Sequence, residues 1–500
     1  MTKPGRIKKL LIANRGEIAL RIHRAASEVG IVTVAVYSDA DRCAPHVLHA
    51  DEAYPLNGDL PGETYLSIDK LIGIALKAQC DAIHPGYGFL SENHLFAKAA
   101  SSSGLIFVGP PAAAIKAMGS KTAARDLMQK ANVPVVPGTR VIAGDYLATS
   151  QAIQRIGYPL LIKAVHGGGG KGMRKVEDAK NLETSLKQAE SESLKAFGNS
   201  EVYVEKYLVN PRHIEIQVLA DTHGNVIFVG ERECSIQRRH QKVIEECPSS
   251  RLSPEARSKM GLAATNAARA CGYVNAGTVE FMVDEDESFY FLEMNTRLQV
   301  EHPITEAVYG IDLVKEQLRI AQGEMLSLTQ EQVIPKGHAI ECRIYAEDPS
   351  NNFLPSTGTI QEYAPSEGYG IRNDSGIITG TAISRFYDPL LAKLIAWGAD
   401  REEARARMIR ALSEYKISGV TTTIPFCVFV LSHPDFAAGN YSIRFVEKNF
   451  KDWDITPDYG IETIASFIAA SMFRSSSNHS ITMQTEEASR SKWKLSRYEE

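Results

Sequence analysis

The sequence predicts an α/β protein made of several domains, and two patterns carry this prediction. Strand-like apolar runs alternate with amphipathic helical segments at the start of the chain, which is typical of a parallel sheet covered by helices. Between residues 208 and 335 strand patterns follow one another, with polar and apolar residues alternating along extended stretches. With 500 residues, the chain is long enough for about three domains.

Residues 1–118 are predicted to form a small domain with a parallel sheet. The run KKLLIAN reads as a buried strand, GEIALRIHRAASEVG as an amphipathic helix and IVTVAVYSD as the next strand. A further helix (LIGIALKAQC) and strand (DAIHP) follow, so the segment HPGYGFLSEN lies on a loop at a strand's carboxyl end, where such sheets bind ligands. A dinucleotide-binding dehydrogenase would begin in the same way. Only Gly16 punctuates the first turn and GYGFLS lacks the third glycine, so the fingerprint of that class is absent.

A separate mobile unit is predicted for residues 135–207. It opens with the proline-rich NVPVVPG and contains the strand YPLLIKAV, the loop HGGGGKGMR and the helix VEDAKNLETSLKQAESESL. Four consecutive glycines flanked by Lys163, Lys171 and Arg174 suit a loop that closes its amides over phosphate oxygens, although a flexible linker is the alternative. No Ser or Thr follows Lys171, so this is not the GxxxxGK[ST] nucleotide loop, and a metal must be bound elsewhere.

The segment from Glu280 to Glu301 supplies candidate metal ligands. Polar residues fall on alternate positions from 293 to 301, separated by Met, Thr, Leu and Val, and this period of two predicts a strand with all of them on one face. They are Glu293, Asn295, Arg297, Gln299 and Glu301. The upstream run GTVEFMVD also alternates, and DEDES between the two runs reads as a hairpin turn.

In the register that pairs Val283 with Tyr290, Glu280 lies opposite Glu293. Directly opposed carboxylates repel unless a cation lies between them. Mg²⁺ or Mn²⁺ prefers carboxylate and amide oxygens, which makes Asn295 the third ligand. A solvated hairpin with a ladder of salt bridges is the alternative.

Composition excludes several classes of protein. The apolar content of 44% and charged content of 23% are those of an ordinary globular chain, and a net charge of −5 gives no field for nucleic acid or an anionic membrane. The 7 cysteines are scattered without a CxxC pair, which indicates a reducing compartment. The N-terminus lacks a signal-peptide pattern and no apolar run approaches the length of a membrane helix, so we expect a cytoplasmic protein.

Two further segments carry candidate nucleotide contacts. In EKYLVNPRHIEIQVLAD, the residues from Glu205 to Leu208 lie where the mobile unit meets the next domain and could read an adenine edge. In ERECSIQRRHQKVIEECP, Lys242 could reach a phosphate, with Gln237 and His240 near ribose or substrate. A solvated mixed-charge surface is the alternative for the second segment.

Eight motifs in order resemble those of the biotin carboxylases of the ATP-grasp superfamily, over residues 5–452. They are LLIANRGEIA, HPGYGFLSEN, MGSK, KAVHGGGGKGMR, EKYLVNPRHIEIQVLAD, QRRHQKVIEE, EMNTRLQVEHPITE and HAIECRIYAEDP. The resemblance implies an α+β ATP-grasp protein with a Rossmann-like N-terminal domain, a mobile lid and a mixed C-terminal domain. The expected divisions are residues 1–118, residues 119–335 including the lid at 135–207, residues 336–453, and a polar extension at 454–500.

The resemblance also implies a reaction. ATP activates bicarbonate as carboxyphosphate, and the carboxyl group is then placed on N1 of biotin. The implied ATP-binding residues are Lys121, Lys163, Gly167, Gly168, Gly169, Gly170, Glu205, Lys206, Leu208, His213, Gln237, His240, Lys242, Glu280 and Glu293. For His213 a structural histidine is the alternative.

The remaining roles concern the metal, bicarbonate and biotin. Glu280, Glu293 and Asn295 correspond to metal ligands for Mg²⁺ or Mn²⁺, with two ions expected. The bicarbonate pocket corresponds to Arg297, Gln299, the Val300 backbone and Glu301. The implied catalytic residues are Glu301 as general base, Arg343 as the group that stabilises the biotin enolate, Arg297 and Lys242. For Arg343 a salt bridge with Glu347 or Asp348 is the alternative.

The implied partners are a biotin carboxyl carrier protein, a carboxyltransferase and a second copy of the chain in a homodimer. No MKM sequence occurs among the 500 residues, so we expect biotin on another chain. The resemblance implies as parent enzyme an acetyl-CoA or other acyl-CoA carboxylase, or a two-subunit pyruvate carboxylase. The remaining alternatives are another bicarbonate-activating ATP-grasp ligase and a non-catalytic protein that only binds ATP. The intact Glu280 and Glu293 pair argues against the last.

Overall fold

The computed structural model describes residues 5–141, 153–164, 174–197, 200–239 and 241–450, with positions 465, 466, 468–470 and 472. The chain divides into two compact units, Met1–Lys451 and Asp452–Glu500, and the fold below is that of the first. Several predictions lie outside the described residues: the glycine loop Gly167 to Gly170, His240, the side chain of Lys121, and most of the 454–500 extension.

The N-terminal part forms a five-stranded parallel sheet in the order β3-β2-β1-β4-β5. Its strands are β1 (Lys9–Ile12), β2 (Val32–Tyr37), β3 (Glu52–Pro55), β4 (Ala82–His84) and β5 (Ile106–Phe107). Its helices are α1 (Gly16–Glu28), α2 (Pro45–His49), α3 (Ile68–Lys77) and α4 (His94–Ser102). The predicted order of strand, helix and strand is therefore confirmed, and with it the parallel sheet.

Alternation along β1 explains how helices cover both faces of this sheet. Leu10 and Ile12 pack in a cluster with Ile18 and Ile22 of α1, whereas Leu11 packs in another cluster with Leu71 of α3. Successive strand residues point to opposite faces, so a continuous apolar run is what a strand buried on both sides requires.

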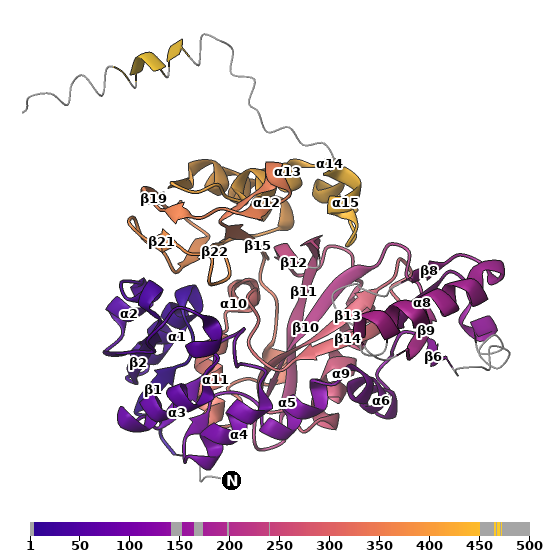
Figure 1. The fold of residues 1–500 in the computed structure, drawn as a ribbon, viewed down its shortest axis with the longest axis horizontal. Coiled ribbons are helices and arrows are strands. Elements are labelled where there is room, and N and C mark those ends of the chain that lie inside the picture. The colour runs from indigo at the N-terminus through magenta and orange to yellow at the C-terminus, as the bar shows by residue number, and fades with distance from the viewer. Residues whose placement is uncertain are drawn as a thin grey trace, which may run out of the picture. The chain divides into compact units, whose positions relative to one another are not determined.

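An eight-stranded antiparallel sheet forms the centre of the unit, in the order β14-β13-β10-β11-β12-β15-β22-β20 (Figure 1). Its strands are β10 (Arg212–Ala220), β11 (Val226–Arg238), β12 (Gln241–Cys247), β13 (Asn275–Val283), β14 (Phe289–Asn295), β15 (His338–Tyr345), β20 (Ile371–Ser375) and β22 (Leu390–Gly398). The sheet thus continues across residue 335, where the sequence suggested a division.

Helices cover the central sheet and connect it to the rest of the unit. They are α5 (Ala112–Met118), α6 (Lys121–Lys130), α9 (Pro254–Ala270), α10 (His302–Tyr309), α11 (Leu313–Ala321), α12 (Arg401–Glu414), α13 (Ile424–Ser432), α14 (Pro434–Ala437) and α15 (Phe445–Asn449). Met260 and Ala264 of α9 pack with Ile214 and Ile216 of β10 in one buried cluster. This face of the sheet is apolar, which leaves the opposite face for polar groups.

The predicted mobile unit has its own four-stranded sheet, ordered β6-β9-β7-β8. It contains β6 (Gly138–Arg140), β7 (Leu160–Ala164), β8 (Arg174–Val176) and β9 (Val202–Lys206), with α8 (Leu182–Phe197) packed on β7. Leu186 of α8 and Ile162 of β7 belong to one buried cluster of this unit. The predicted strand and helix are confirmed, while their connecting loop lies outside the described residues.

Three short strand pairs complete the C-terminal part. They are β16 (Glu347–Asp348) with β17 (Leu354–Pro355), β18 (Gly358–Thr359) with β21 (Ala382–Ile383), and β19 (Glu362–Ala364) with β23 (Lys416–Ser418). Among the residues that the structure describes, no helix is both long and apolar enough to cross a bilayer.

The hairpin of β13 and β14 corrects two predictions. Glu280 does lie opposite Glu293, but a bulge between Glu280 and Phe281 shifts the register, so that Val283 pairs with Phe289 rather than Tyr290. The predicted strand also ends too late, because β14 stops at Asn295 and residues 296–301 form a loop leading into α10. Pro303 stands in the first turn of α10, where proline is preorganised for a helix and cannot extend a sheet ladder.

Candidate active site

A row of charged residues crosses the polar face of the central sheet. Glu293 of β14 pairs in register with Glu280 of β13, Glu280 with Glu215 of β10, and Glu215 with Arg232 of β11. Residues paired across antiparallel strands place their side chains on the same face. Three carboxylates therefore lie side by side, followed by one guanidinium.

Lys242 of β12 joins this row to the loop after β14. Its Nζ lies 2.6 Å from Glu215 Oε2, 2.9 Å from Glu280 Oε1 and 2.7 Å from Glu301 Oε1. Arg232, which is fully buried, pairs with Glu215 and donates to Thr305 Oγ1 at 2.9 Å. A buried charge is tolerated only when it is paired, and these cations supply that pairing. For Glu215 burial still outweighs the attraction of Arg232 and Lys242, and its pKa is raised.

The pKa values follow from this arrangement. Burial opposes ionisation of Glu301, but attraction by Lys242, Arg343 and Arg232 outweighs it and holds the pKa of Glu301 well below its ordinary value. Burial likewise opposes ionisation of Glu280, but attraction by Lys242 and His213 outweighs it, so the pKa of Glu280 is also lowered. The pKa of Lys242 is raised well above its ordinary value, because the three carboxylates outweigh the effect of burial. At neutral pH the site holds carboxylates and an ammonium.

The loop of residues 296–301 gathers the predicted bicarbonate residues. Arg297 donates from Nη2 to Asn295 Oδ1 at 3.0 Å and from Nη1 to Gln299 Oε1 at 2.9 Å. Gln299 in turn donates to Glu280 Oε1 at 3.1 Å. The structure thus brings Arg297, Gln299 and Glu280 together through a loop, and not through the strand that the sequence predicted.

Glu92 is a site residue that the sequence reasoning missed. Its Oε2 accepts from Arg297 Nε at 2.9 Å, and its Oε1 accepts from the Thr296 amide at 3.0 Å. It lies in the segment HPGYGFLSEN, whose position at the carboxyl end of β4 was the available signal. Arg232 and Glu215 were missed as well, Arg232 because its segment reads as an ordinary mixed-charge surface, and Glu215 because only the start of its segment was considered for nucleotide contacts.

Arg343 of β15 lies on the other side of Glu301. Its Nη2 is 2.9 Å from Glu301 Oε2, and its Nε is 2.6 Å from Glu245 Oε1. The alternative of a salt bridge with Glu347 is wrong, because Glu347 lies beyond the end of β15 and pairs with Arg238 at 2.7 Å. Burial raises the pKa of Glu245 to about 7, against the attraction of Arg343. Glu301 is therefore held between an ammonium and a guanidinium.

The predicted nucleotide contacts lie on neighbouring strands. His213 Nε2 is 2.8 Å from Glu280 Oε2, and its Nδ1 is 2.6 Å from Gln237 Nε2. In the unit of residues 135–207, Lys163 of β7 pairs with Glu205 at the end of β9. Lys206 ends β9 and Leu208 follows two residues later.

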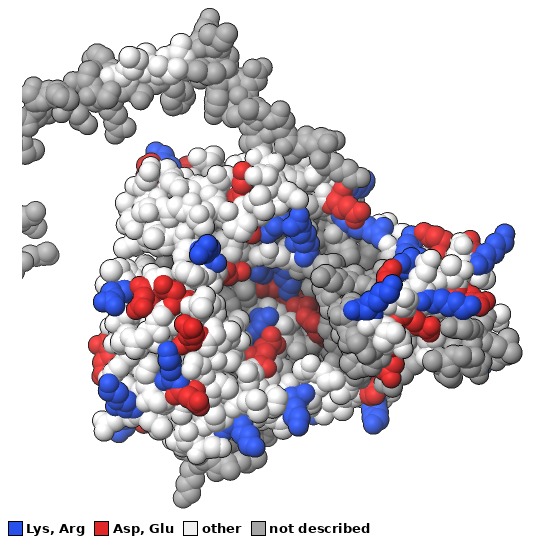
Figure 2. Space-filling view, in the orientation of Figure 1, with Lys and Arg blue, Asp and Glu red and all other residues white. Residues whose placement is uncertain are grey.

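The donor set near Glu280 fits a divalent cation. Glu280 and Glu293 are directly opposed carboxylates, and hard cations prefer such oxygen ligands. Asn295 donates its amide Nδ2 to Glu280 at 2.8 Å and its Oδ1 accepts from Arg297, so it would turn its amide to offer oxygen. Figure 2 shows acidic and basic side chains together in a hollow near the centre of the drawn face.

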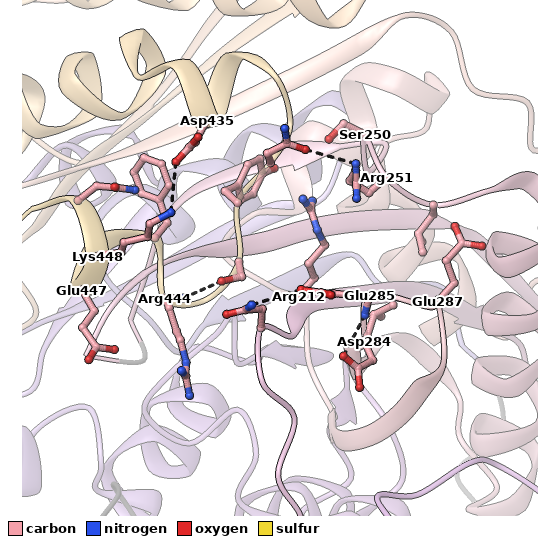
Figure 3. A pocket seen from close by; sticks show the side chains of 18 residues that line it. Arg212, Ser250, Arg251, Asp284, Glu285, Glu287, Asp435, Arg444, Glu447 and Lys448 are labelled. Carbon is pink, nitrogen blue, oxygen red and sulfur yellow. Dashed lines mark hydrogen bonds and ion pairs between the residues drawn. The ribbon is translucent and has the colours of Figure 1, made fainter. Parts of the chain in front are cut away.

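A cavity of about 1150 Å³ is lined by other residues than these (Figure 3). It is lined by the loop before β10, the tip of the β13 and β14 hairpin, and the chain from α14 to α15. Its charged groups largely pair with polar neighbours, as when Lys448 lies 3.9 Å from Asp435 and Asn210 donates to Glu285 at 3.2 Å. None of the predicted site residues lines it.

Three family models match the chain and together cover most of it. "Biotin carboxylase, N-terminal domain" matches residues 6–115. "Carbamoyl-phosphate synthase L chain, ATP binding domain" matches residues 120–329, and "Biotin carboxylase C-terminal domain" matches residues 341–448.

A similar protein belongs to the same family as these models. The chain is 52% identical over 442 residues to biotin carboxylase 1 of Bacillus subtilis. The match covers 88% of this chain and 98% of that protein, so it extends over nearly the whole of the relative.

Two solved structures give the same fold. The biotin carboxylase subunit of pyruvate carboxylase superposes with a TM-score of 0.81 at 48% identity, covering 88% of this chain and 98% of that one. The second is the biotin carboxylase domain dimer of Hydrogenobacter thermophilus 2-oxoglutarate carboxylase, in complex with MgADP, ADP and bicarbonate. It superposes with a TM-score of 0.82 at 46% identity, covering 90% of this chain and 100% of that one. The chain belongs to the biotin carboxylase family of ATP-grasp enzymes.

Proposed function

We propose that the chain uses ATP and bicarbonate to carboxylate N1 of biotin on a carrier protein, through carboxyphosphate. The observation that carries this proposal is the Glu301 carboxylate, held by Lys242 at 2.7 Å and Arg343 at 2.9 Å beside the loop that presents Arg297 and Gln299. The base Glu301 therefore lies between the guanidinium of Arg297, which suits an anion, and the guanidinium of Arg343. A ligase that does not act on biotin would not need Arg343.

Arg297 and Gln299 are proposed to bind bicarbonate, with the Val300 backbone. A planar guanidinium binds a planar anion by two parallel hydrogen bonds, which an ammonium cannot do. Glu92 accepts a hydrogen bond from Nε of Arg297. The two terminal nitrogens of Arg297 are then left to engage Asn295, Gln299 and a ligand. Bicarbonate therefore meets a guanidinium that is already oriented.

Glu301 is proposed to take the proton of bicarbonate. Because its pKa is well below the ordinary value, the carboxylate is ionised at neutral pH, while the cations that lower the pKa also weaken Glu301 as a base. The deprotonated oxygen then attacks the terminal phosphorus of ATP, with ADP as leaving group. Phosphate groups that draw Lys242 away would loosen one of the two cations on Glu301 and so raise its basicity.

Arg343 is proposed to face the ureido oxygen of biotin as N1 gives up its proton to the phosphate that is released when carboxyphosphate breaks down to CO₂, which N1 then attacks. Negative charge then develops on that oxygen, and a fixed guanidinium stabilises it more in the transition state than in the ground state. Glu245 orients Arg343 from behind, through Nε at 2.6 Å. The nitrogen Nη2, now 2.9 Å from Glu301, lies on the side where the reaction occurs.

Glu280, Glu293 and Asn295 are proposed to hold two divalent ions, Mg²⁺ or Mn²⁺. When bound, the metal neutralises charge on the nucleotide phosphates. Lys121, Lys163, the glycines 167–170, Lys242 and His240 are proposed for the phosphate and ribose side, with His213 and Gln237 next to Glu280. Glu205, Lys206 and Leu208 are proposed for the adenine side.

We propose that a biotin carboxyl carrier protein, a carboxyltransferase and a second copy of the chain are the partners. The homodimer is supported by the dimeric relative from Hydrogenobacter thermophilus. Light scattering coupled to size-exclusion chromatography would measure the mass of the purified chain in solution, and we expect the mass of a dimer. We propose an acyl-CoA carboxylase as the parent enzyme. A two-subunit pyruvate carboxylase is the second candidate, favoured by the 48% identity to the biotin carboxylase subunit of pyruvate carboxylase.

Phosphate release from Mg·ATP by the purified chain tests the proposal. Reactions with bicarbonate alone, free biotin alone, both, and a biotinylated carrier would be compared. Release that requires bicarbonate and rises with biotin or carrier is expected. Release that bicarbonate stimulates, but neither biotin nor carrier affects, would point to another bicarbonate-activating ligase.

A further inference from the structure

A lysine that no motif singled out lies behind the bicarbonate loop. Lys393, in β22, is fully buried, and its Nζ donates to the carbonyl oxygen of Val300 at 2.8 Å. The same ammonium lies 3.0 Å from Glu17 Oε1 in the first turn of α1. A single side chain therefore connects the C-terminal part of the unit, the first helix and the loop of residues 296–301.

Glu17 pairs directly with this ammonium, but burial raises the pKa of Glu17 to about 7 against the attraction of Lys393, so Glu17 supplies only part of the counter-charge. Asp374 and Glu341 also attract the Lys393 ammonium. An ammonium removed from water is costly unless a carboxylate compensates it. Glu17 is itself anchored, because its Oε1 accepts from the hydroxyl of Tyr87 in the segment HPGYGFLSEN, and the Lys393 ammonium lies 5.8 Å from the centre of the Tyr87 ring. The pair is thus held between the first turn of α1 and the loop that follows β4.

The loop that receives this bond is held by α10 at its end, where the His302 amide donates to the Gln299 carbonyl and the Ile304 amide donates to the Glu301 carbonyl, both at 3.4 Å. Three further bonds support the rest of its length. The Thr296 amide donates to Glu92, the Leu298 carbonyl accepts from Arg297 at 3.2 Å, and the Gln299 carbonyl lies 2.8 Å from His302 Nδ1. The Val300 carbonyl belongs to the peptide group that links Val300 to Glu301. Fixing that carbonyl fixes the plane from which the Glu301 side chain departs.

We propose that Lys393, with Glu17 as its counter-ion, is a positioning residue for the bicarbonate step, because it holds the peptide between Val300 and Glu301. The inference rests on the proposed function. Lys393 touches neither substrate nor nucleotide in this role. It fixes the backbone carbonyl of Val300, while Lys242 and Arg343 hold the side-chain carboxylate of Glu301.

The test compares Lys393→Met, Lys393→Arg and Glu17→Gln with the wild-type chain. For Lys393→Met, the KM for bicarbonate is expected to rise about 10-fold to 100-fold, as for loss of a hydrogen bond from a charged donor. The KM for Mg·ATP and the Kd for ADP are expected to stay within about twofold, because the nucleotide contacts are untouched. Lys393→Arg keeps a charge and a donor and is expected to recover most of the affinity for bicarbonate.

Hydrogen exchange of the peptide covering residues 296–302 gives a readout that needs no turnover. It is expected to be faster in Lys393→Met and in Glu17→Gln than in the wild type. The control is Arg401→Met, which also removes an ion pair, here between the half-buried Arg401 and the buried Glu246 at 2.7 Å, with no contact to this loop among those of Arg401. The control is expected to leave both the exchange and the KM for bicarbonate unchanged.

Three outcomes separate the possibilities. Unchanged exchange and an unchanged KM for bicarbonate in Lys393→Met would overturn the inference. An equal rise of that KM in Arg401→Met would also overturn it, since general loosening would then explain the effect. A wild-type chain without bicarbonate-dependent phosphate release would refute the proposed function, while faster exchange in the variants would still support the anchoring of Val300.

Discussion

Glu301 is the residue on which the proposed chemistry depends most. We expect Glu301→Gln to lower bicarbonate-dependent turnover by about 10²-fold to 10⁴-fold, the usual contribution of a general base. Nucleotide binding should be largely retained, because the phosphate and metal groups remain. Steady-state phosphate release and binding of a fluorescent ADP would measure the two effects.

The matched control for this prediction is Glu287→Gln. Glu287 is a carboxylate at the tip of the β13 and β14 hairpin, where it accepts from the Ser253 amide at 2.7 Å. Turnover should be nearly unchanged in this variant. Turnover at the wild-type rate in Glu301→Gln would eliminate Glu301 as the base.

Glu246 is predicted to make stability depend on pH outside the active site. Burial opposes its ionisation, but His338 at 3.0 Å and Arg401 at 2.7 Å outweigh it and lower its pKa from 4.5 to about 2. A carboxyl whose pKa is depressed on folding adds stability above its unfolded pKa of about 4.5, and this stability is lost as the pH falls towards about 2. The contribution at neutral pH is about 3 kcal/mol.

Thermal unfolding of Glu246→Gln and wild type between pH 7 and pH 4 would check this. The difference in Tm should be largest at pH 7 and should begin to narrow below about pH 5. A difference that stays constant across this range would mean that the Glu246 carboxylate is not stabilised by its neighbours.

Residue type alone could predict much of the candidate site. The alternation from Glu293 to Glu301 brought attention to Arg297 and Gln299, but a loop rather than the predicted strand places them: Gln299 donates to Glu280 and Arg297 donates to Gln299. The loop position of HPGYGFLSEN was a signal for Glu92 but did not name its partner, and the sequence could not reveal Arg232, because its role depends on which strands are neighbours. A mixed-charge run looks solvated until the sheet that buries it is known.

The hairpin of β13 and β14 is the element that carries the proposed metal ligands. We expect Glu293→Ala to weaken binding of Mg·ATP far more than binding of metal-free ATP, because only the first uses the cation. Calorimetric titration with and without Mg²⁺ would measure both. The control is Leu292→Ala, an exposed neighbour on the same strand whose loss should affect neither.

An equal loss of both affinities in Glu293→Ala would instead indicate that the hairpin had been disturbed. This element also shows how far a pattern can predict register. The pairing of Glu280 with Glu293 is confirmed, but the register predicted beyond it is wrong by one residue at Val283. A bulge leaves the alternation on one strand intact while shifting its partner, so a single strand pattern does not contain it.

The contact between α1 and the turn after β20 is predicted to be intolerant of added volume. A Cβ at Gly376 would lie 2.6 Å from the Glu17 amide nitrogen and 2.8 Å from Gly16, which is backbone that cannot move aside cheaply. Gly376→Ala should therefore destabilise the fold by about 1–3 kcal/mol. Thermal unfolding would measure it.

Gly62→Ala is the comparison for this change, since a Cβ there meets nothing within 4 Å. It should leave the Tm nearly unchanged. A wild-type Tm in Gly376→Ala would mean that α1 can shift away from the turn without cost.

At the scale of the whole molecule, the sequence could predict the classes of element but not how they join. The N-terminal parallel sheet follows from local alternation of strands and helices, so it was predictable. The central sheet pairs β12 with β15, whose residues are about a hundred positions apart. Pairing between such distant segments leaves no periodic signal in the sequence. The sequence could therefore suggest a division at residue 335, but it could not show that both sides of this division contribute strands to one sheet.

The shared sheet predicts how the chain behaves when it is cut at that division. A fragment of residues 336–453 would carry β15, β20 and β22 without β12, and would bury Arg343 and Lys393 without Glu245, Glu301 and Glu17. Unpaired buried charges and an open strand edge are both strongly unfavourable. We expect the fragment alone to show no cooperative unfolding in calorimetry or circular dichroism, and co-production with residues 1–335 to restore a transition like that of the uncut chain. A cooperative transition in the isolated fragment would show that it folds independently, and that the ion pairs across the division contribute to the active site rather than to folding.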